Sequence, residues 1–525
     1  MTGSSEIRTL GDIPRLQARV RPDKSAFVFG QRETSYRELD EHSNRVANGL
    51  AAEGVEPQDR VAFLDRNSER YFELFFGCAK ANVVMVAVNW RLAPPELRHI
   101  LEDSGARVLF VGEEFLPAVE KIRDRLPRLR EVIVVSGDPG RHADYVAWRD
   151  RQQGHDPRVT VEPGDTAIQM YTSGTTGRPK GVQLPHYSFL ALRLPEDDPR
   201  QEDWQRWRSD EVSLVAMPVF HIAGTGWGVQ GAYYGARNVV VADFVPAEVL
   251  SILERERISK LFMVPAAILF VLNDPACPNT DFSSLKYVLY GASPIPLDLL
   301  RRAMEVFQCE FVQVYGMTET CGQATYLPPE EHDPDGNERM RSAGKALPGV
   351  ELAVVDAAGN RLPPREVGEI CVRSPSNMAG YWNLPEATRE TMRDGWVRTG
   401  DAGYMDEGGY VYMYDRIKDM IVSGGENIYP AEIESALYGH PGIADVAVIG
   451  VPDERWGEVP RAVVVARDAA LNESDVIAWA RENLAGYKVP KSVDFVGELP
   501  RNPSGKLLKR ELRAPYWDGR ERRIN

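Results

Sequence analysis

The sequence predicts an α/β protein: a large N-terminal domain of mixed α/β subdomains with a small β-barrel, then a small, mobile α+β C-terminal domain. The chain has 525 residues, more than the roughly 250–300 at which a single hydrophobic core stops growing. Short apolar runs alternate with amphipathic segments over residues 166–316, which is typical of a parallel sheet covered by helices. We expect one domain over residues 1–417, with the barrel near 330–416, and a second over 418–525.

The alternating region predicts strands and helices in turn. The expected strands are residues 167–170, 238–242, 261–264, 286–290 and 311–315, and the expected helices are residues 246–258, a helix beginning at Pro265, and residues 297–307. Ligands bind such sheets at the carboxyl ends of the strands. We therefore expect the loops that begin at Tyr171 and follow Tyr290 and Tyr315 to open on the same edge.

The flanking regions follow other patterns. Residues 35–126 carry a similar mixed α/β signal. Between residues 350 and 414 the helical pattern vanishes, and short strands at 351–355, 369–373 and 410–414 predict the barrel. After residue 418 the pattern predicts helices at 430–438 and 473–484, strands at 445–451, 461–466 and 492–496, and a frayed tail at 517–525.

Composition excludes several classes of function. The chain is 43% apolar and 26% charged, as in ordinary globular proteins, and its net charge of −15 argues against nucleic-acid binding. Five widely spaced cysteines without a CxxC pair predict neither a zinc site nor disulfides. With no signal-peptide pattern and no apolar run long enough to span a bilayer, we expect a soluble cytoplasmic protein, compatible with a homodimer.

One loop carries most of the functional information. Residues 171–181 read YTSGTTGRPKG and follow a short apolar strand. Glycines let main-chain N–H groups turn toward an anion, hydroxyls add donors, and Lys180 adds a charge, which together favour a phosphate site. The register of the common P-loop fails, because Lys180 stands between Pro179 and Gly181. The expected nucleotide contacts here are Thr172, Ser173, Gly174, Thr175, Thr176, Gly177 and Lys180.

This string resembles the nucleotide loop of the adenylate-forming superfamily, which includes acyl-CoA synthetases, aryl-CoA ligases, luciferases and the adenylation domains of peptide synthetases. The resemblance covers nearly the whole chain, since the other motifs follow in the family's order, and it is closest in look to bacterial fatty-acid or aryl-acid CoA ligases. It implies ATP, Mg²⁺ and CoA acting on a small carboxylic acid.

Two further motifs complete the implied nucleotide site. Residues 290–294, YGASP, resemble the segment that lies against adenine and the acyl group, through Gly291, Ala292 and Ser293. Residues 315–320, YGMTET, resemble the motif in which Tyr315 packs on adenine beside Gly316 and Met317. By the same resemblance Thr318 donates to the α-phosphate and Glu319 helps to hold Mg²⁺, a role for which one carboxylate plus phosphates is sufficient.

The ribose and the catalytic lysine have their own motifs. Asp401, in RTGD, resembles the carboxylate that accepts hydrogen bonds from both ribose hydroxyls, and Arg416 resembles the second ribose contact. Lys418 stands where the family has its hinge. Lys506, in PSGK, resembles the adenylation lysine, a cation that stabilises the charge building on the α-phosphorus at the transition state.

The acyl pocket is implied by a third group. His221, in FHIAG, resembles the residue that swings at the pocket mouth between the half-reactions. The expected lining is His221, Gly224, Gly226, Trp227, Val264, Tyr290, Gly291 and Met317, with Trp227 shortening the pocket. It is apolar and has no aspartate for an α-amino group, so we expect a fatty, alicyclic or aryl acid. Residues 195–209 are expected to be solvated, with Trp204 and Trp207 packed locally, rather than a lid.

The acceptor side is less distinct. Gly424 and Gly425 resemble the strand that lines the pantetheine tunnel, Trp456 lies in another family-like cluster, and Lys488 could meet CoA phosphates. The whole pattern predicts an ATP-dependent carboxylic acid–CoA ligase. One alternative is an amide synthetase of the same superfamily, with an amine as acceptor. A more distant one is a non-catalytic nucleotide-binding protein, which predicts the loss of Lys506, Glu319 or Asp401, although all three are present.

Overall fold

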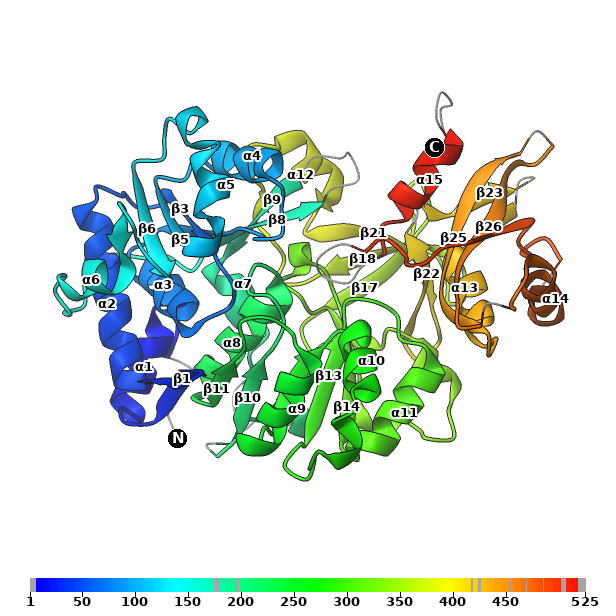
Figure 1. The fold of residues 1–525 in the computed structure, drawn as a ribbon, viewed down its shortest axis with the longest axis horizontal. Coiled ribbons are helices and arrows are strands. Elements are labelled where there is room, and N and C mark those ends of the chain that lie inside the picture. The colour runs from blue at the N-terminus through cyan, green and yellow to red at the C-terminus, as the bar shows by residue number, and fades with distance from the viewer. Residues whose placement is uncertain are drawn as a thin grey trace.

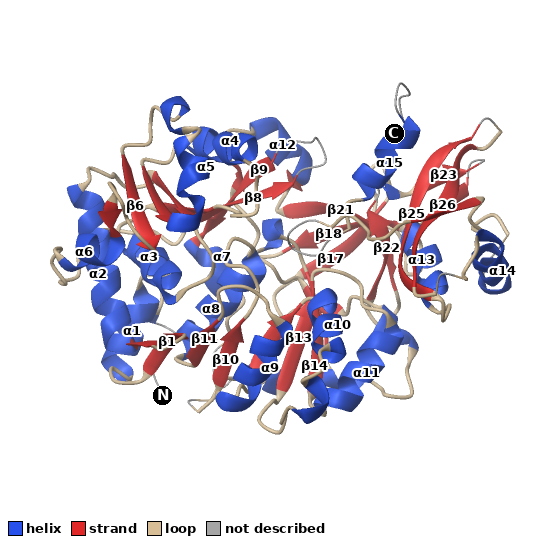
Figure 2. Ribbon diagram, viewed as in Figure 1, coloured by secondary structure: helices blue, strands red, loops and turns tan. Residues whose placement is uncertain are grey.

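The computed structural model describes residues 6–173, 179–194, 198–208, 210–416, 419–423, 426–453, 455–468, 470–484, 486–501 and 507–517. Two large α/β lobes lie beside each other, a small antiparallel sheet follows them, and a smaller unit carries the C-terminal part of the chain (Figure 1; Figure 2). This is the mixed α/β architecture predicted from the sequence. No helix in the described ranges is long and apolar enough to cross a membrane.

The first lobe is built on a mainly parallel sheet of nine described strands, here called the nine-stranded sheet. In spatial order they are β16 (Lys345–Ala346), β15 (Thr325–Leu327), β14 (Glu310–Tyr315), β13 (Tyr287–Gly291), β12 (Lys260–Met263), β10 (Val212–Val215), β11 (Arg237–Val240), β1 (Ser25–Phe29) and β2 (Arg32–Ser35). Its helices are α8 (Ile222–Tyr234), α9 (Pro246–Arg255), α10 (Pro265–Asn273) and α11 (Leu297–Phe307). The elements predicted over residues 238–315 are confirmed to within a few residues.

The second lobe is built on eight described strands, here called the eight-stranded sheet. In order they are β19 (Gly380–Tyr381), β9 (Pro179–Pro185), β8 (Thr166–Ser173), β4 (Val84–Ala87), β3 (Arg60–Leu64), β5 (Val108–Gly112), β6 (Glu131–Ser136) and β7 (Ala143–Asp144). The accompanying helices are α1 (Asp12–Val20), α2 (Tyr36–Ala52), α3 (Glu69–Lys80), α4 (Pro94–Ser104), α5 (Leu116–Glu120), α6 (Tyr145–Asp150) and α7 (His186–Leu190). The α/β signal of residues 35–126 is thereby confirmed.

Helix α3 joins the two lobes into one core. Nearly all of its residues are buried, because apolar side chains occupy every face of the helix. Phe72 stacks on Phe27 of β1 with ring centroids 4.3 Å apart, and Tyr71 meets Phe63 of β3 edge to face at 5.0 Å. The Tyr71 hydroxyl also shares a hydrogen bond of 2.6 Å with Thr225 on α8. One helix therefore packs against strands of both sheets.

The prediction that three loops open on one edge of one sheet holds for the loops after β13 and β14, which are neighbouring parallel strands, but is wrong for the Tyr171 loop. Strand β8 belongs to the eight-stranded sheet, whereas β13 and β14 belong to the nine-stranded sheet. An alternation of strands and helices along the chain looks the same whether the strands join one sheet or two. After the Tyr171 loop the chain also returns as the antiparallel strand β9, in a hairpin, rather than through a crossover helix.

Five described strands form the small antiparallel sheet in the region where the barrel was predicted. They are β17 (Glu351–Val355), β18 (Gly368–Arg373), β21 (Trp396–Met405), β20 (Met392–Arg393) and β22 (Val411–Arg416). The expectation of no helix between residues 350 and 414 is wrong, because α12 (Pro385–Thr391) lies there. This helix has no buried residue, so its sequence lacks the apolar periodicity from which a helix is predicted.

The C-terminal unit contains five described strands and three helices. The strands are β24 (Glu426–Ile428), β23 (Ile421–Ser423), β26 (Gly457–Ala466), β25 (Ile443–Asp453) and β27 (Ser492–Phe495), and the helices are α13 (Pro430–Tyr438), α14 (Glu473–Asn483) and α15 (Lys509–Trp517). The predicted tail begins too early, since the Trp517 indole donates a 3.0 Å hydrogen bond to the Gly450 carbonyl. Residues 518–525 lie outside the described residues, and the boundary at residue 418 stays a prediction.

Candidate active site

The loop after β14 meets the edge of the other sheet. Glu319 lies in a short 3-10 turn, Thr318–Thr320, and is only 5% exposed. The Tyr381 hydroxyl on β19 donates a 2.8 Å hydrogen bond to its carboxylate, and the Met378 amide donates one of 2.8 Å to its carbonyl. The proposed metal ligand is therefore held by a residue of the eight-stranded sheet.

The predicted phosphate loop approaches the same tyrosine. In the β8–β9 hairpin Thr172 pairs with Lys180, and the ammonium of Lys180 lies 4.9 Å from the centre of the Tyr381 ring. Gly174, Thr175, Thr176 and Gly177 lie outside the described residues, and of Ser173 only the strand pairing is described. Tyr381 thus links Glu319 to Lys180, and sequence reasoning missed it because β19 is only two residues long.

A second contact joins the nucleotide motifs to the small antiparallel sheet. The Tyr315 hydroxyl donates a 2.6 Å hydrogen bond to Asp401, whose side chain is buried on β21. In the antiparallel pair β21–β22 the strand partner of Asp401 is Arg416. The predicted adenine-packing residue and both predicted ribose contacts are therefore neighbours, although they come from distant parts of the sequence.

The glycines of the two motifs have a structural reason that the sequence did not reveal. A Cβ at Gly291 would lie 2.1 Å from the Val314 carbonyl oxygen, and one at Gly316 would lie 2.6 Å from the Gly322 carbonyl oxygen. The close approach of neighbouring backbone therefore requires glycine at both positions. Ala292 has a φ of +67°, a left-handed conformation that is costly for a residue with a Cβ, and Ala292 and Ser293 are exposed.

His221 lies at the N-terminus of α8, and one of its ring nitrogens has no hydrogen-bond partner among the described residues. Its Nε2 is buried and has no hydrogen-bond partner in the described structure. Burial, with a smaller contribution from the Arg91 guanidinium, lowers the pKa of His221 to about 4. The imidazole is therefore neutral near pH 7, and its unpartnered Nε2 can hydrogen-bond to a ligand.

The remaining residues predicted for the acyl pocket differ in how accessible they are. Gly226 is half-buried, and a Cβ there would meet only Ile222, at 3.6 Å, whereas one at Gly224 would lie 2.3 Å from the Pro218 carbonyl oxygen. Tyr290 is fully buried, with its hydroxyl bonded to His332 and Gln313, so none of its ring is open to a substrate. Trp227 is buried, while Val264 and Met317 are half-buried.

The segment predicted to be solvated is in fact packed into the fold. Trp204 is 3% exposed and lies against Tyr326 of β15, and Trp207 lies against Trp227 on α8 with ring centroids 5.5 Å apart. Lys260, buried on β12, donates hydrogen bonds to the Trp204 and Arg206 carbonyls. The tryptophans therefore make long-range contacts rather than local ones. Residues 195–197 and 209 lie outside the described residues.

The predicted acceptor side is only partly described. Gly424 and Gly425 lie outside the described residues, as do Lys418, the predicted hinge, and Lys506, the predicted catalytic lysine. Trp456 is 43% exposed and stacks with the Arg455 guanidinium, 4.7 Å from its ring centre. Lys488 forms an ion pair of 2.5 Å with Glu432, so its charge is already partnered.

Glu319 is compatible with a Mg²⁺ site whose other ligands come from the nucleotide. The described residues contain no group of three His, Cys, Asp or Glu side chains able to hold a metal alone. Glu319 nevertheless offers a buried carboxylate, with one oxygen positioned by Tyr381, in the region that Lys180 makes positive. Hard oxygen ligands of this kind, completed by phosphates, suit Mg²⁺.

Comparison with protein families agrees with this geometry. The family model described as AMP-binding enzyme matches residues 15–382, and the model of the AMP-binding enzyme C-terminal domain matches residues 432–506. The chain belongs to the AMP-binding enzyme family. The first model includes the segments around residues 172 and 319.

Similar proteins of the family are ligases. A fatty acid–[acyl-carrier-protein] ligase, ScoC, from Streptomyces coeruleorubidus is 43% identical over 99% of both chains. A feruloyl-CoA synthase from an Amycolatopsis species is 42% identical over 97% of this chain and 99% of the relative. Family and relatives together identify the chain as an AMP-forming ligase of the acyl-CoA synthetase type.

Solved structures support the same fold. The anthranilate CoA ligase AuaEII, solved with anthranoyl-AMP, has a TM-score of 0.88 and 29% identity, with 98% of this chain and 99% of that chain covered. The amide bond synthetase McbA from Marinactinospora thermotolerans has a TM-score of 0.85 and 27% identity, with 97% and 100% covered. The fold of this chain is thus shared by ligases with different acceptors.

Proposed function

We propose that this chain activates a fatty, alicyclic or aryl carboxylic acid with Mg·ATP and transfers the acyl group to CoA in the cytoplasm, as a monomer or a homodimer. The observation that carries the proposal is the pair of hydrogen bonds Tyr315–Asp401 and Tyr381–Glu319. These bonds draw the adenine, ribose and phosphate contacts predicted from the sequence into one region. The proposal assigns ribose to Asp401 and Arg416, and phosphates to Thr318 and Lys180.

In the first half-reaction a carboxylate oxygen of the acid attacks the α-phosphorus of ATP. The new acyl–phosphate bond forms as the bond to the β-phosphate breaks, and pyrophosphate leaves. When bound, Mg²⁺ supplies positive charge that offsets the phosphate oxygens, and Glu319 is the residue that would hold it. Lys506 places a second positive charge where negative charge develops on the α-phosphate, which stabilises the transition state more than the bound substrates.

In the second half-reaction a thiolate displaces AMP. The small domain turns about Lys418, Lys506 withdraws, and the Gly424–Gly425 segment faces the adenylate. The sulfur attacks the acyl carbon, a thioester forms, and the bond to the AMP phosphate oxygen breaks. A neutral His221 suits this step, because its free Nε2 position can hydrogen-bond to the acid or the thioester without a competing ion pair.

The acceptor is the part of the proposal with a serious rival. Lys488, the predicted contact for a CoA phosphate, is already paired with Glu432. A thiol on a carrier protein or an amine would not need that contact. The name of ScoC supports a carrier protein as an alternative acceptor, and the name of McbA supports an amine.

The decisive experiment separates activation from transfer. Purified protein, Mg·ATP and a panel of acids are tested first for exchange of labelled pyrophosphate into ATP, which reports adenylation without an acceptor. AMP release is then measured with CoA, with a phosphopantetheinylated carrier protein and with simple amines. If none of the acids in the panel supports pyrophosphate exchange, the proposal is overturned. If only an amine stimulates AMP release, the acceptor is an amine and not CoA.

Three variants test which residues serve each half-reaction. Lys506→Ala is expected to abolish pyrophosphate exchange but to spare thioester formation from preformed acyl-adenylate. Gly425→Leu and Lys418→Pro are expected to do the reverse. Equal loss of both half-reactions in all three folded variants would contradict the domain rotation.

A further inference from the structure

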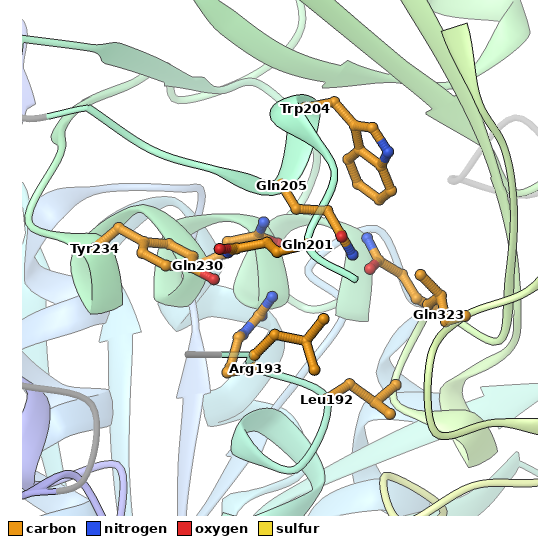
Figure 3. A pocket seen from close by; sticks show the side chains of 10 residues that line it. Leu192, Arg193, Gln201, Trp204, Gln205, Gln230, Tyr234 and Gln323 are labelled. Atoms are coloured by element: carbon orange, nitrogen blue, oxygen red, sulfur yellow. The ribbon is translucent and has the colours of Figure 1, made fainter. Parts of the chain in front are cut away.

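A cavity lies beyond the predicted acyl pocket, at the far part of α8. Its volume, about 20 Å³, is room for a small polar group, and it lies between the segment after α7, the packed segment around Trp204, helix α8 and the loop after Glu319. Figure 3 shows side chains from all four segments gathered around the same space. Its lining residues are Leu192, Arg193, Leu194, Gln201, Trp204, Gln205, Gln230, Tyr234, Gln323 and Leu347.

The wall of this cavity is unusually polar for the end of a pocket expected to hold a hydrocarbon. Four glutamines and one arginine line it, and none of the described residues that line it is acidic. Gln230 is only 5% exposed, and its amide makes no hydrogen bond within the part of the chain that the structure describes. Its amide atoms are accessible from the cavity, so a bound ligand with a polar group would gain hydrogen bonds there.

Arg193 gives the wall of the cavity a positive charge. Its guanidinium is half-buried and forms neither an ion pair nor a hydrogen bond with any described residue, and Figure 3 shows it directed toward the glutamines. On the Trp204 segment, Glu202 accepts a hydrogen bond from the Tyr326 hydroxyl and Asp203 pairs with Arg206. An unpaired cation among neutral donors favours an anionic or oxygen-rich group.

Helix α8 runs from His221 at its N-terminus to the wall of this cavity at Gln230 and Tyr234. His221 caps its N-terminus, and Ile222, Gly226, Gln230 and Tyr234 follow at intervals of four residues on one slowly turning face. Ile222, Gly226 and Tyr234 are half-buried, whereas the residues flanking Gly226 are buried. Nine residues of helix separate His221 from Gln230, about 13 Å along the axis.

We propose that the acid activated by this enzyme carries a second oxygen-bearing group, a carboxylate or a hydroxyl, at the end remote from the reacting carboxylate, and that Arg193 and Gln230 bind it. This inference rests on the proposed function, because it names the substrate class of the same site. The carboxylate that reacts lies near His221, and the remote group lies in the cavity lined by Arg193.

The test compares acids matched in length. Hexanoic, octanoic and decanoic acids are compared with adipic, suberic and sebacic acids and with the corresponding ω-hydroxy acids, and cinnamic acid with para-hydroxycinnamic acid. The readout is kcat/KM for acid-dependent pyrophosphate release. The wild-type enzyme is expected to prefer a bifunctional acid over its plain counterpart by about tenfold or more, the usual contribution of a hydrogen bond to a charged group.

Two variants assign the preference to the cavity. Arg193→Met and Gln230→Leu keep side-chain volume while removing the polar group, and each is expected to lower kcat/KM for the preferred acid about tenfold without lowering it for the plain acid. Arg255→Met on α9, at an exposed position, serves as the matched control and should change neither value.

Each result bears on one of the two proposals. A preference for the plain acids, or a bifunctional preference that both variants leave unchanged, overturns the role of the cavity while adenylation itself still stands. Absence of pyrophosphate release with every acid overturns the proposed function instead. Comparison of the dicarboxylic acids with the hydroxy acids shows whether the remote group is a carboxylate or a hydroxyl.

Discussion

Tyr381 is the residue on which the phosphate end of the site depends most directly. Its hydroxyl fixes the Glu319 carboxylate, and its ring lies beside the Lys180 ammonium. A carboxylate accepting a hydrogen bond from a rigid aromatic ring is positioned before the metal arrives, so binding need not order it.

Replacing Tyr381 with Phe tests this positioning. The variant keeps the ring beside Lys180 but removes the hydrogen bond, and we expect KM for Mg·ATP to rise about tenfold with little change in thermal stability. Tyr410→Phe, which removes a hydroxyl bonded to Glu331 in the small antiparallel sheet, is the matched control. If both variants raise KM equally, the hydrogen bond to Glu319 has no special role.

At the scale of elements, helix α8 contains two glycines whose replacement by alanine is expected to have opposite effects on stability. Gly226→Ala places a Cβ in ordinary van der Waals contact with Ile222 and favours the helix, so we expect a small gain in stability of about 0.5–1 kcal/mol but lower kcat/KM for bulky acids. Gly224→Ala meets the Pro218 carbonyl oxygen and is expected to be destabilising. Thermal denaturation and pyrophosphate release together separate the two, and loss of stability in Gly226→Ala would contradict the assignment.

The segment around Trp204 depends on Lys260. This ammonium is 1% exposed, forms a 3.1 Å ion pair with Glu211 and bonds two backbone carbonyls of the segment. Lys260→Met leaves the buried Glu211 with only the half-exposed Lys286, and we expect a loss of about 3 kcal/mol in the free energy of unfolding. Urea denaturation followed by tryptophan fluorescence measures it, and Lys260→Met/Glu211→Gln should recover part of the loss.

The elements also show how far the sequence could be interpreted. Helix α11 was predicted with its observed bounds, because the local sequence pattern is sufficient to predict an amphipathic helix between two apolar strands. Local patterns gave no sign that β8 joins a different sheet from β14, that the two-residue strand β19 exists, or that Trp204 packs on Tyr326. Each of these depends on contacts between residues far apart in the chain, which only the folded structure brings together.

For the molecule as a whole, three buried histidines predict a pH dependence of stability. Burial lowers the pKa values of His186, His221 and His332 to about 4, each from an ordinary value of 6.5. Between these values the unfolded chain binds protons that the folded chain does not. The free energy of unfolding therefore falls as the pH is lowered from 6.5 toward 4, by up to about 1.4 kcal/mol per pH unit for each histidine.

Urea denaturation at several pH values across this range checks the prediction. The His186→Asn/His332→Gln variant removes two of the three groups while leaving His221 at the site, and its stability should vary less steeply with pH. A slope equal to that of the wild-type protein would show that other groups control the acid sensitivity.

The place of β19 in the chain has a consequence for biosynthesis. The strand bearing Tyr381 completes the edge of a sheet whose neighbouring strands, β8 and β9, were made some two hundred residues earlier, after the chain has built most of the other lobe. A nascent polypeptide stalled on the ribosome before that strand emerges would have the β8–β9 hairpin and the Glu319 turn in contact, but without the Tyr381 hydrogen bond that positions the carboxylate. Because Asp401 and Arg416 are made later still, retention of such stalled chains on an ATP resin should begin only once residue 416 has emerged.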